Sequence, residues 1–150
     1  FRQAGFRLLL NEYEHIEKDD QKFTLAGVEN WGNPPFPQYG DLEGTLKKVE
    51  RDQFIVLMSH DPSHWDAQVK DHPNVFLTLS GHTHAMQFGI RLGRWHWSPV
   101  KWKYKKWAGL YSENGQHLYV NKGLGFIGFP GRVGMYPEIT VFHLTSAADS

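Results

Sequence analysis

Four short segments near the start and middle of the chain are rich in apolar residues that favour β-strands. They are residues 5–11, 23–28, 53–58 and 75–79, and the last two are almost continuously apolar. A run of this kind, bounded by polar residues, is typical of a strand buried on both faces, as in the inner part of an α/β sheet. The charged stretch 14–22 between the first two segments predicts a polar turn.

Two further strands and two helices complete the predicted pattern. Residues 117–121 are similar to a strand, and residues 139–144 have the alternating apolar positions of a strand that closes the sheet. A helix is expected to begin at Asp41, a favoured N-cap residue that is followed by apolar residues three and four apart. The polar segment 63–72 also predicts a helix. This order indicates one α/β domain, without internal repeats or a domain boundary.

Composition agrees with one folded domain of 150 residues. The chain is 40% hydrophobic and 15% aromatic, which is enough apolar material for a core. Its 16 lysines and arginines balance 16 aspartates and glutamates, so the net charge gives no reason to expect nucleic acid as a partner. Because the chain has no cysteine, disulfides and thiolate ligands are excluded, and any metal ion must be held by His, Asp, Glu or Asn.

Histidines follow the ends of the two most apolar strands. The first strand leads into His60, and the second leads into a Gly-His-Thr-His sequence that contains His82 and His84. The carboxyl ends of such strands face the crevice where α/β domains bind ligands. Taken singly, each histidine is more simply explained as an ordinary polar residue at a strand end. In an extended segment His82 and His84 would share a face, whereas a tight turn after Gly81 could direct them toward two neighbouring ions. Three imidazoles after two adjacent buried strands, with glycine beside them to relieve backbone crowding, are better explained by a metal cluster.

The same motifs resemble those of the calcineurin-like metallophosphoesterases, and in particular those of bacterial membrane-associated enzymes. The resemblance is carried by IVLMSHDP at residues 55–62 and by LTLSGHTHAMQ at residues 77–87. It extends to LLLNE and LAGVEN near the start and to NKGLG and PEITVFHL near the end. It therefore implies that residues 1–150 are the C-terminal portion of such a domain, whose fold is an α/β (α+β) sandwich of four layers, α-β-β-α.

The resemblance implies a site with two divalent metal ions, for which Mn, Fe, Zn and Mg are candidates. In that family a metal-bound hydroxide attacks a phosphate ester, and the two cations stabilise the attacking and leaving oxygens. Carried over by motif, His60 and His82 would bind one ion and His84 the other. The family's carboxylate ligands come from three motifs that precede the LLLNE segment, and none of them precedes it here. We therefore expect part of a ligand set, and a chain that is inactive or nearly so by itself.

Three more residues are candidates for supporting roles. Asp61 and His64 lie close to His60 in the sequence and could orient imidazole rings by hydrogen bonds, although a structural role is simpler for His64. Arg132, in the glycine-rich segment 123–134, is a candidate for binding a substrate phosphate through its guanidinium. That segment also contains Gly-x-Gly-x-x-Gly, but its proline and later glycines prevent the helix that a dinucleotide site requires.

Residues 91–107 hold four of the six tryptophans and six of the 16 lysines and arginines. One interpretation is contact with a membrane surface, where Trp and Lys anchor together, which would suit a lipid-linked phosphate substrate. Stacking on single-stranded nucleic acid is another interpretation, but we expect no nucleic-acid partner. A hairpin whose tryptophans cover the sheet while its lysines are solvated explains the segment equally well.

Metal-dependent hydrolysis of a phosphate monoester or diester is the function that these features favour. Two alternatives stay open: a non-catalytic module that binds a membrane or partner through residues 91–107, and a mononuclear zinc protein that uses the three histidines. Because the chain begins at Phe1 without Met, we expect a fragment whose unpaired sheet edge favours dimers or aggregates. The compartment stays open between a bacterial cytoplasm and a membrane, to which a segment outside this chain would attach the protein.

Overall fold

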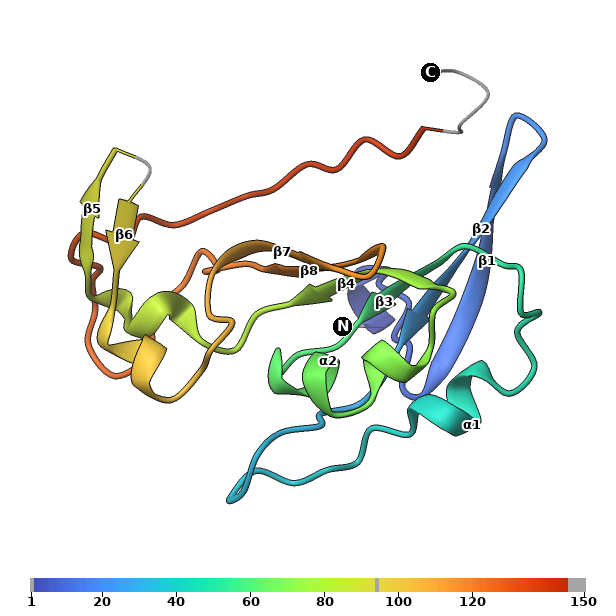
Figure 1. Cartoon of the computed structure of the whole chain (residues 1–150), viewed down its shortest axis with the longest axis horizontal. Coiled ribbons are helices and arrows are strands. Elements are labelled where there is room, and N and C mark those ends of the chain that lie inside the picture. The colour runs from blue at the N-terminus through green and yellow to red at the C-terminus, as the bar shows by residue number, and fades with distance from the viewer. Residues whose placement is uncertain (1, 94, 146–150) are drawn as a thin grey trace.

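The computed structural model describes residues 2–93 and 95–145, in which six strands form a mixed sheet with helices on one face (Figure 1). The strands are β1 (Glu12–Lys18), β2 (Gln21–Gly27), β3 (Ile55–Met58), β4 (Val75–Ser80), β7 (Gly109–Glu113) and β8 (Gln116–Val120), in the order β1-β2-β3-β4-β8-β7. The central strands β2, β3, β4 and β8 are parallel, and the edge strands β1 and β7 are antiparallel to their neighbours. The α/β class predicted from the sequence is confirmed.

Short helices and a separate hairpin make up the rest of the described chain. The helices are η1 (Arg2–Ala4), α1 (Leu42–Leu46), α2 (Ser63–Ala67), η2 (Val69–Asp71), η3 (His84–Gln87) and η4 (Pro99–Trp102). Strands β5 (Ile90–Leu92) and β6 (Trp95–Trp97) pair antiparallel and stand apart from the six-stranded sheet (Figure 1). Within residues 2–93 and 95–145, no helix is both long enough and apolar enough to span a membrane.

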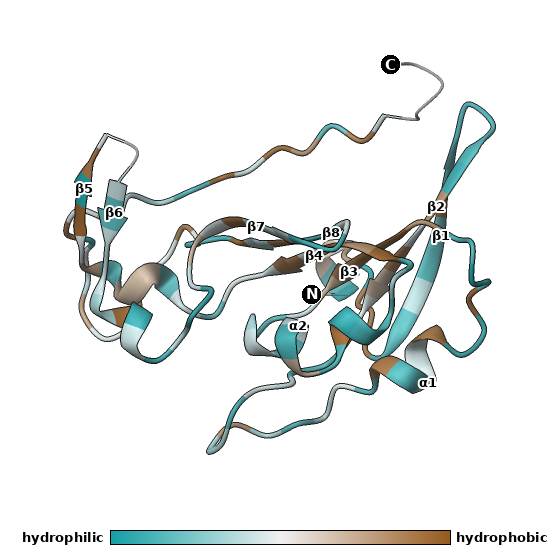
Figure 2. Ribbon diagram, in the orientation of Figure 1, coloured by the Kyte–Doolittle hydropathy of each residue, from teal (hydrophilic) through white to brown (hydrophobic). Residues whose placement is uncertain are grey.

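The main core lies between helices α1 and α2 and one face of the sheet. Leu42 from α1 and Trp65 from α2 are buried there against Ile55, Leu57 and Leu118 of the strands. Strands β3 and β4 carry much of the hydrophobic colour in Figure 2, whereas the edge strand β1 is mostly hydrophilic. Burial of the central strands follows from their apolar sequences, because apolar side chains are stabilised when they are removed from water.

The two predicted helices form, but the second is interrupted. Asp41 caps α1, and its carboxylate accepts a hydrogen bond from the backbone nitrogen of Gly44 at 2.8 Å. The predicted helix 63–72 is divided into α2 and η2, because Gln68 has a φ of −140°, outside the helical range.

A second, smaller core lies under the basic aromatic segment. It consists of Ala85, Val100, Tyr104, Trp107, Ala108 and Met135. Trp107 is therefore buried, whereas Trp95 is 56% exposed and Trp102 is 75% exposed. The predicted hairpin is present as β5 and β6, but it does not cover the main sheet, so the tryptophans divide between a small core and the surface.

Two predicted strands do not form in the described chain. Residues 5–11 make no strand. The turn predicted in the stretch 14–22 is present but shorter, at residues 19 and 20, and the rest of the stretch belongs to β1 and β2. β1 and β3 occupy both edges of β2, so the first segment cannot pair with β2, and it does not use the free outer edge of β1. Residues 139–144 run extended without a strand partner in the described chain (Figure 1). Thr140 contacts Tyr119 of β8, but β4 and β7 occupy both edges of that strand, so the segment cannot pair with it.

Candidate metal centre

His60 and His82 lie together because the strands that precede them are parallel neighbours. Strands β3 and β4 pair in parallel, so their carboxyl ends meet at the same edge of the sheet. The backbone nitrogen of Gly81 donates to the carbonyl of His60 at 3.0 Å, which joins the two loops. As a result, Nε2 of His60 lies 3.1 Å from Nδ1 of His82, with the two rings edge to face.

The backbone of the second histidine motif turns sharply, and the turn is made by residues other than glycine. His82 has a φ of 64° and His84 a φ of 48°, and positive φ continues through the three residues after His84. For residues other than glycine, this left-handed region costs about 1–2 kcal/mol each. Buried Thr83 helps to hold the turn by donating its hydroxyl to the carbonyl of Trp107 at 2.7 Å. Strain of this kind persists where the surroundings enforce it, and it is concentrated at functional sites.

Tyr104 and Asp61 orient the ring of His82. The Tyr104 hydroxyl lies 2.7 Å from Nε2 of His82 and donates to Oδ2 of Asp61 at 3.4 Å. With the tyrosine hydrogen directed at Asp61, the tyrosine oxygen would accept from Nε2–H of His82, and in that tautomer Nδ1 has a lone pair facing His60. Burial, together with the charge and hydrogen bond of Asp61, raises the pKa of Tyr104 to about 12, so the hydroxyl keeps its proton.

Asp61 is fully buried and fixed in position by the residue two places further on. Its Oδ1 accepts from the backbone nitrogen of Ser63 at 2.8 Å and from the Ser63 hydroxyl at 2.5 Å. Its Oδ2 lies 3.6 Å from Nε2 of His82. Asp61 therefore acts on the ring of His82, directly and through Tyr104, although in the sequence it is adjacent to His60.

His64 belongs to a separate buried network. Its Nδ1 lies 2.8 Å from the hydroxyl of Ser59, its Nε2 lies 2.9 Å from Oε1 of Gln68, and the ring of Trp31 stacks on it. Burial is the main cause that lowers the pKa of His64. Because both ring nitrogens are occupied in this way, the structure gives His64 a packing role between the end of β3 and helix α2.

His84 and Arg132 face the same glycine. A side-chain carbon added to Gly123 would lie 3.8 Å from Nδ1 of His84 and 3.8 Å from Nη2 of Arg132. Within residues 2–93 and 95–145, Nδ1 of His84 and Nη1 of Arg132 are both buried without a hydrogen-bond partner. Nη2 of Arg132 donates to the carbonyls of Lys122 and Gly125. Buried polar groups without partners are rare in native proteins, and these two atoms are available to contact a ligand.

The three histidines provide imidazole donors but no complete set of metal ligands. Burial is the main cause that lowers the pKa of His60, His82 and His84, which favours the neutral form that binds metal ions. In the part of the chain that the structure describes, no three His, Asp or Glu side chains form a group that could hold an ion. The donors therefore fit one part of a metal centre, and the mononuclear zinc alternative would need His84 to join the other two.

Tyr104 is a site residue that no pattern in the sequence indicates. It lies among the lysines and tryptophans of residues 91–107, and it is 22 residues beyond His82 in the chain. Helix η4 returns the chain toward the histidines and places the tyrosine in the second core. No local motif signals this contact, since it depends on where the chain turns back.

Comparison with known proteins gives several relatives of one kind. The chain is 37% identical over 149 residues to the Bacillus subtilis metallophosphoesterase YkuE. The matched region covers 95% of this chain and 48% of YkuE. It is 32% identical over 135 residues to the Bos taurus transmembrane protein with metallophosphoesterase domain. That match covers 87% of this chain and 29% of the Bos taurus protein. A second Bacillus subtilis metallophosphoesterase, YkoQ, is 28% identical over 150 residues, or 94% of this chain and 50% of that protein. No family model and no solved structure matches the chain.

The chain belongs to the metallophosphoesterase family, and the resemblance seen in its sequence motifs is confirmed. Within that family it matches bacterial proteins such as YkuE along almost its whole length. It spans about half the length, or less, of the curated relatives described above.

Proposed function

We propose that this chain supplies the histidine ligands of an enzyme that hydrolyses phosphate monoesters or diesters with two divalent metal ions. The proposal is carried by one observation, the facing ring nitrogens of His60 and His82 at the ends of two parallel strands. The unpartnered Nδ1 of His84 adds a third donor. Since the chain spans about half of its bacterial relatives, we propose that the carboxylate ligands come from the part of the domain that this chain does not contain.

The residues of this chain hold and orient the groups that react. His60 and His82 would bind one ion and His84 the other, with Mn, Fe, Zn or Mg as candidates. When bound, such ions provide a nucleophilic hydroxide at neutral pH and stabilise the charge of the reacting phosphate. Tyr104 and Asp61 keep the His82 ring in one orientation and one tautomer. Through Nη1 of Arg132, which is buried and unpartnered among the described residues, the chain would hold a phosphate oxygen of the substrate near His84.

Hydrolysis is tested by replacing the matched region of Bacillus subtilis YkuE with this chain. This chimera (the replaced protein) and the chain alone are assayed with p-nitrophenyl phosphate and bis-p-nitrophenyl phosphate in the presence of Mn²⁺. We expect turnover by the replaced protein, little or none by the chain alone, and a loss on His82→Ala larger than the roughly 10–100-fold typical of an outer-shell partner. His117→Ala, on β8, is the control and should keep full activity. Metal-dependent turnover that survives His82→Ala unchanged would overturn the site assignment.

A second proposal concerns the surface next to the site. We infer that residues 91–107 contact a membrane surface and that the substrate is lipid-linked. Trp95 and Trp102 are exposed, and Lys101, Lys103 and Lys105 form no ion pair with any described residue. Exposed tryptophans beside unpaired lysines suit the interface of an anionic membrane.

Vesicle flotation tests the membrane contact. The chain should float with vesicles of phosphatidylserine and phosphatidylcholine, and the Trp95→Ala/Trp102→Ala variant should stay in solution. Tyr39→Ala, which removes an exposed aromatic ring elsewhere, should float like the unmodified chain. If the tryptophan variant also floats, the segment does not provide the contact.

A further inference from the structure

A cavity lies between the β5–β6 hairpin and the segment that follows β8. Its volume is about 410 Å³, which is within the range of small-molecule sites. Arg91 and His96 line it from the hairpin, and Lys122 and Glu138 line it from the other side. Lys122 on its wall precedes Gly123, the residue that His84 and Arg132 face, and this connects the cavity to the candidate metal centre along the chain.

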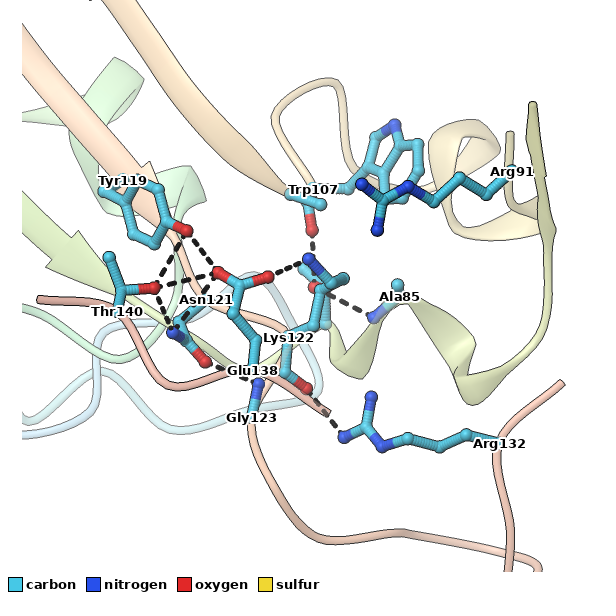
Figure 3. Close-up of polar contacts among 12 residues, drawn as sticks. Ala85, Arg91, Trp107, Tyr119, Asn121, Lys122, Gly123, Arg132, Glu138 and Thr140 are labelled. Atoms are coloured by element: carbon cyan, nitrogen blue, oxygen red, sulfur yellow. Dashed lines mark hydrogen bonds and ion pairs between the residues drawn. The ribbon is translucent and has the colours of Figure 1, made fainter. Parts of the chain in front are cut away.

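Positive charge is concentrated around this cavity. Lys122 and Arg91 line it, and Arg132 lies beside them, with its Nη2 donating to the Lys122 carbonyl at 2.8 Å. Figure 3 shows the side chains of Arg91 and Arg132 extending toward Lys122 from two sides. Burial, followed by the charges of Arg91 and Arg132, lowers the pKa of Lys122, as expected for an ammonium with two guanidinium groups nearby.

Glu138 balances only one of these charges. Its carboxylate side chain is 16% exposed, pairs with Lys122, and accepts hydrogen bonds from the hydroxyls of Tyr119 and Thr140 (Figure 3). Arg91 and Arg132 form no ion pair with any described residue. The hairpin cannot supply a carboxylate, because no Asp or Glu occurs in the sequence from residue 72 to residue 112.

The hydrogen-bond donors that line the cavity suit an anion with several oxygens. Arg91 has a planar guanidinium whose one hydrogen bond to the described residues is a long contact, 3.4 Å, from Nε to the carbonyl of Gly93. The fork of a guanidinium matches the oxygens of a phosphoryl group, and the ammonium of a lysine adds a point charge. The exposed Tyr136 also lines the cavity and brings a hydroxyl. A neutral or cationic ligand would leave the excess charge unbalanced.

We propose that this cavity binds a phosphoryl group, with the guanidinium of Arg91 as its main contact. Two sources share this chemistry. One is a second phosphate on the ester substrate, with the scissile phosphate held near the histidines, and this source rests on the proposed function. The other is a free phosphate ion, which phosphomonoester hydrolysis releases.

Calorimetric titration of the chain with inorganic phosphate, in EDTA and at constant ionic strength, tests the site without any metal. We expect saturable binding that Arg91→Gln weakens by at least about tenfold, equal to about 1.4 kcal/mol. Arg91→Lys should lose less, because it keeps the charge but not the fork. Lys101→Gln removes a nearby charge that does not line the cavity, and it should bind phosphate normally. Equal affinity in Arg91→Gln and Lys101→Gln, or no saturable binding at all, would overturn the proposal.

Further measurements distinguish the two sources of the phosphoryl group, and they also separate the cavity proposal from the proposed hydrolysis. If the cavity holds a second substrate phosphate, Mn²⁺ should raise the affinity for glucose 1,6-bisphosphate but not for inorganic phosphate, and Arg91→Gln should abolish that gain. If the source is free phosphate, the bisphosphate should bind no more tightly with Mn²⁺ than without it. His82→Ala should leave metal-free phosphate binding unchanged. If the metal-centre proposal is wrong, phosphate should still bind in EDTA. If the cavity proposal is wrong, metal-dependent hydrolysis should still be observed.

Discussion

The Nε2 atom of His60 faces the Nδ1 atom of His82 at a distance of 3.1 Å, across the ends of two parallel strands. Two imidazoles placed in this way can direct lone pairs at one ion without a change in the fold. The arrangement depends on the orientation of the His82 ring, because Nε2 of that ring is held by Tyr104. The first prediction therefore concerns the tyrosine.

Tyr104→Phe should weaken Mn²⁺ binding while leaving the chain folded. The substitution removes the hydroxyl that lies between His82 and Asp61 but keeps the ring that packs in the second core. Loss of an outer partner of a ligating histidine typically costs about 10–100-fold in metal affinity. Calorimetry measures the affinity, and Tyr39→Phe, at an exposed position, is the control. An unchanged Mn²⁺ affinity in Tyr104→Phe would show that the hydroxyl does not orient the ligand.

How much of this site the sequence predicts differs from residue to residue. The positions of His60 and His82 follow from two apolar runs, since buried parallel strands place their ends together. Tyr104 could not be predicted in the same way, because its contact depends on the path of the chain through η4. Residues 139–144 have the pattern of a strand, but a pattern does not state which strand the segment will lie beside. Here it lies beside β8, through Thr140 and Tyr119, and both edges of β8 are taken.

The stability of the chain should fall in mild acid partly because of His64. Burial lowers the pKa of this histidine below the ordinary value of 6.5. Between that lowered pKa and 6.5, the unfolded chain binds more protons than the folded one, so the free energy of unfolding decreases as the pH falls through this window. His64→Gln removes the titrating group and should flatten the dependence. Urea unfolding at several pH values between 5 and 7.5 measures it, and identical slopes in both proteins would contradict the prediction.

Gly134→Ala should destabilise the chain. Gly134 has a φ of +70°, and an added side-chain carbon would lie 2.0 Å from the carbonyl oxygen of Gly89. The left-handed backbone alone costs about 1–2 kcal/mol for an alanine, and the backbone of Gly89 must also move. Gly125→Ala is the matched control, since its added carbon meets no described atom within 4 Å and its φ is not positive. Urea unfolding should separate the two variants, and equal stability would show that the close approach is not required.

The extended segment 139–144 should make the chain self-associate. Ile139 is 78% exposed and Val141 is 74% exposed, on a segment without a strand partner in the described chain. Unpaired, apolar, strand-like segments form pairs with other chains. Ile139→Lys/Val141→Lys should therefore shift sedimentation toward the monomer, whereas Thr145→Lys should not. A strictly monomeric unmodified chain at high concentration would contradict the expectation.

Metal titration of the chain by calorimetry tests the central claim most directly. If His60, His82 and His84 are part of a shared metal centre, Mn²⁺ and Zn²⁺ should bind weakly, and His60→Ala/His84→Ala should abolish the binding. His117→Ala should leave it unchanged. Tight, stoichiometric binding of one Zn²⁺ would contradict this account and support a mononuclear zinc protein, and binding that survives the double substitution would show that the histidines are not the ligands.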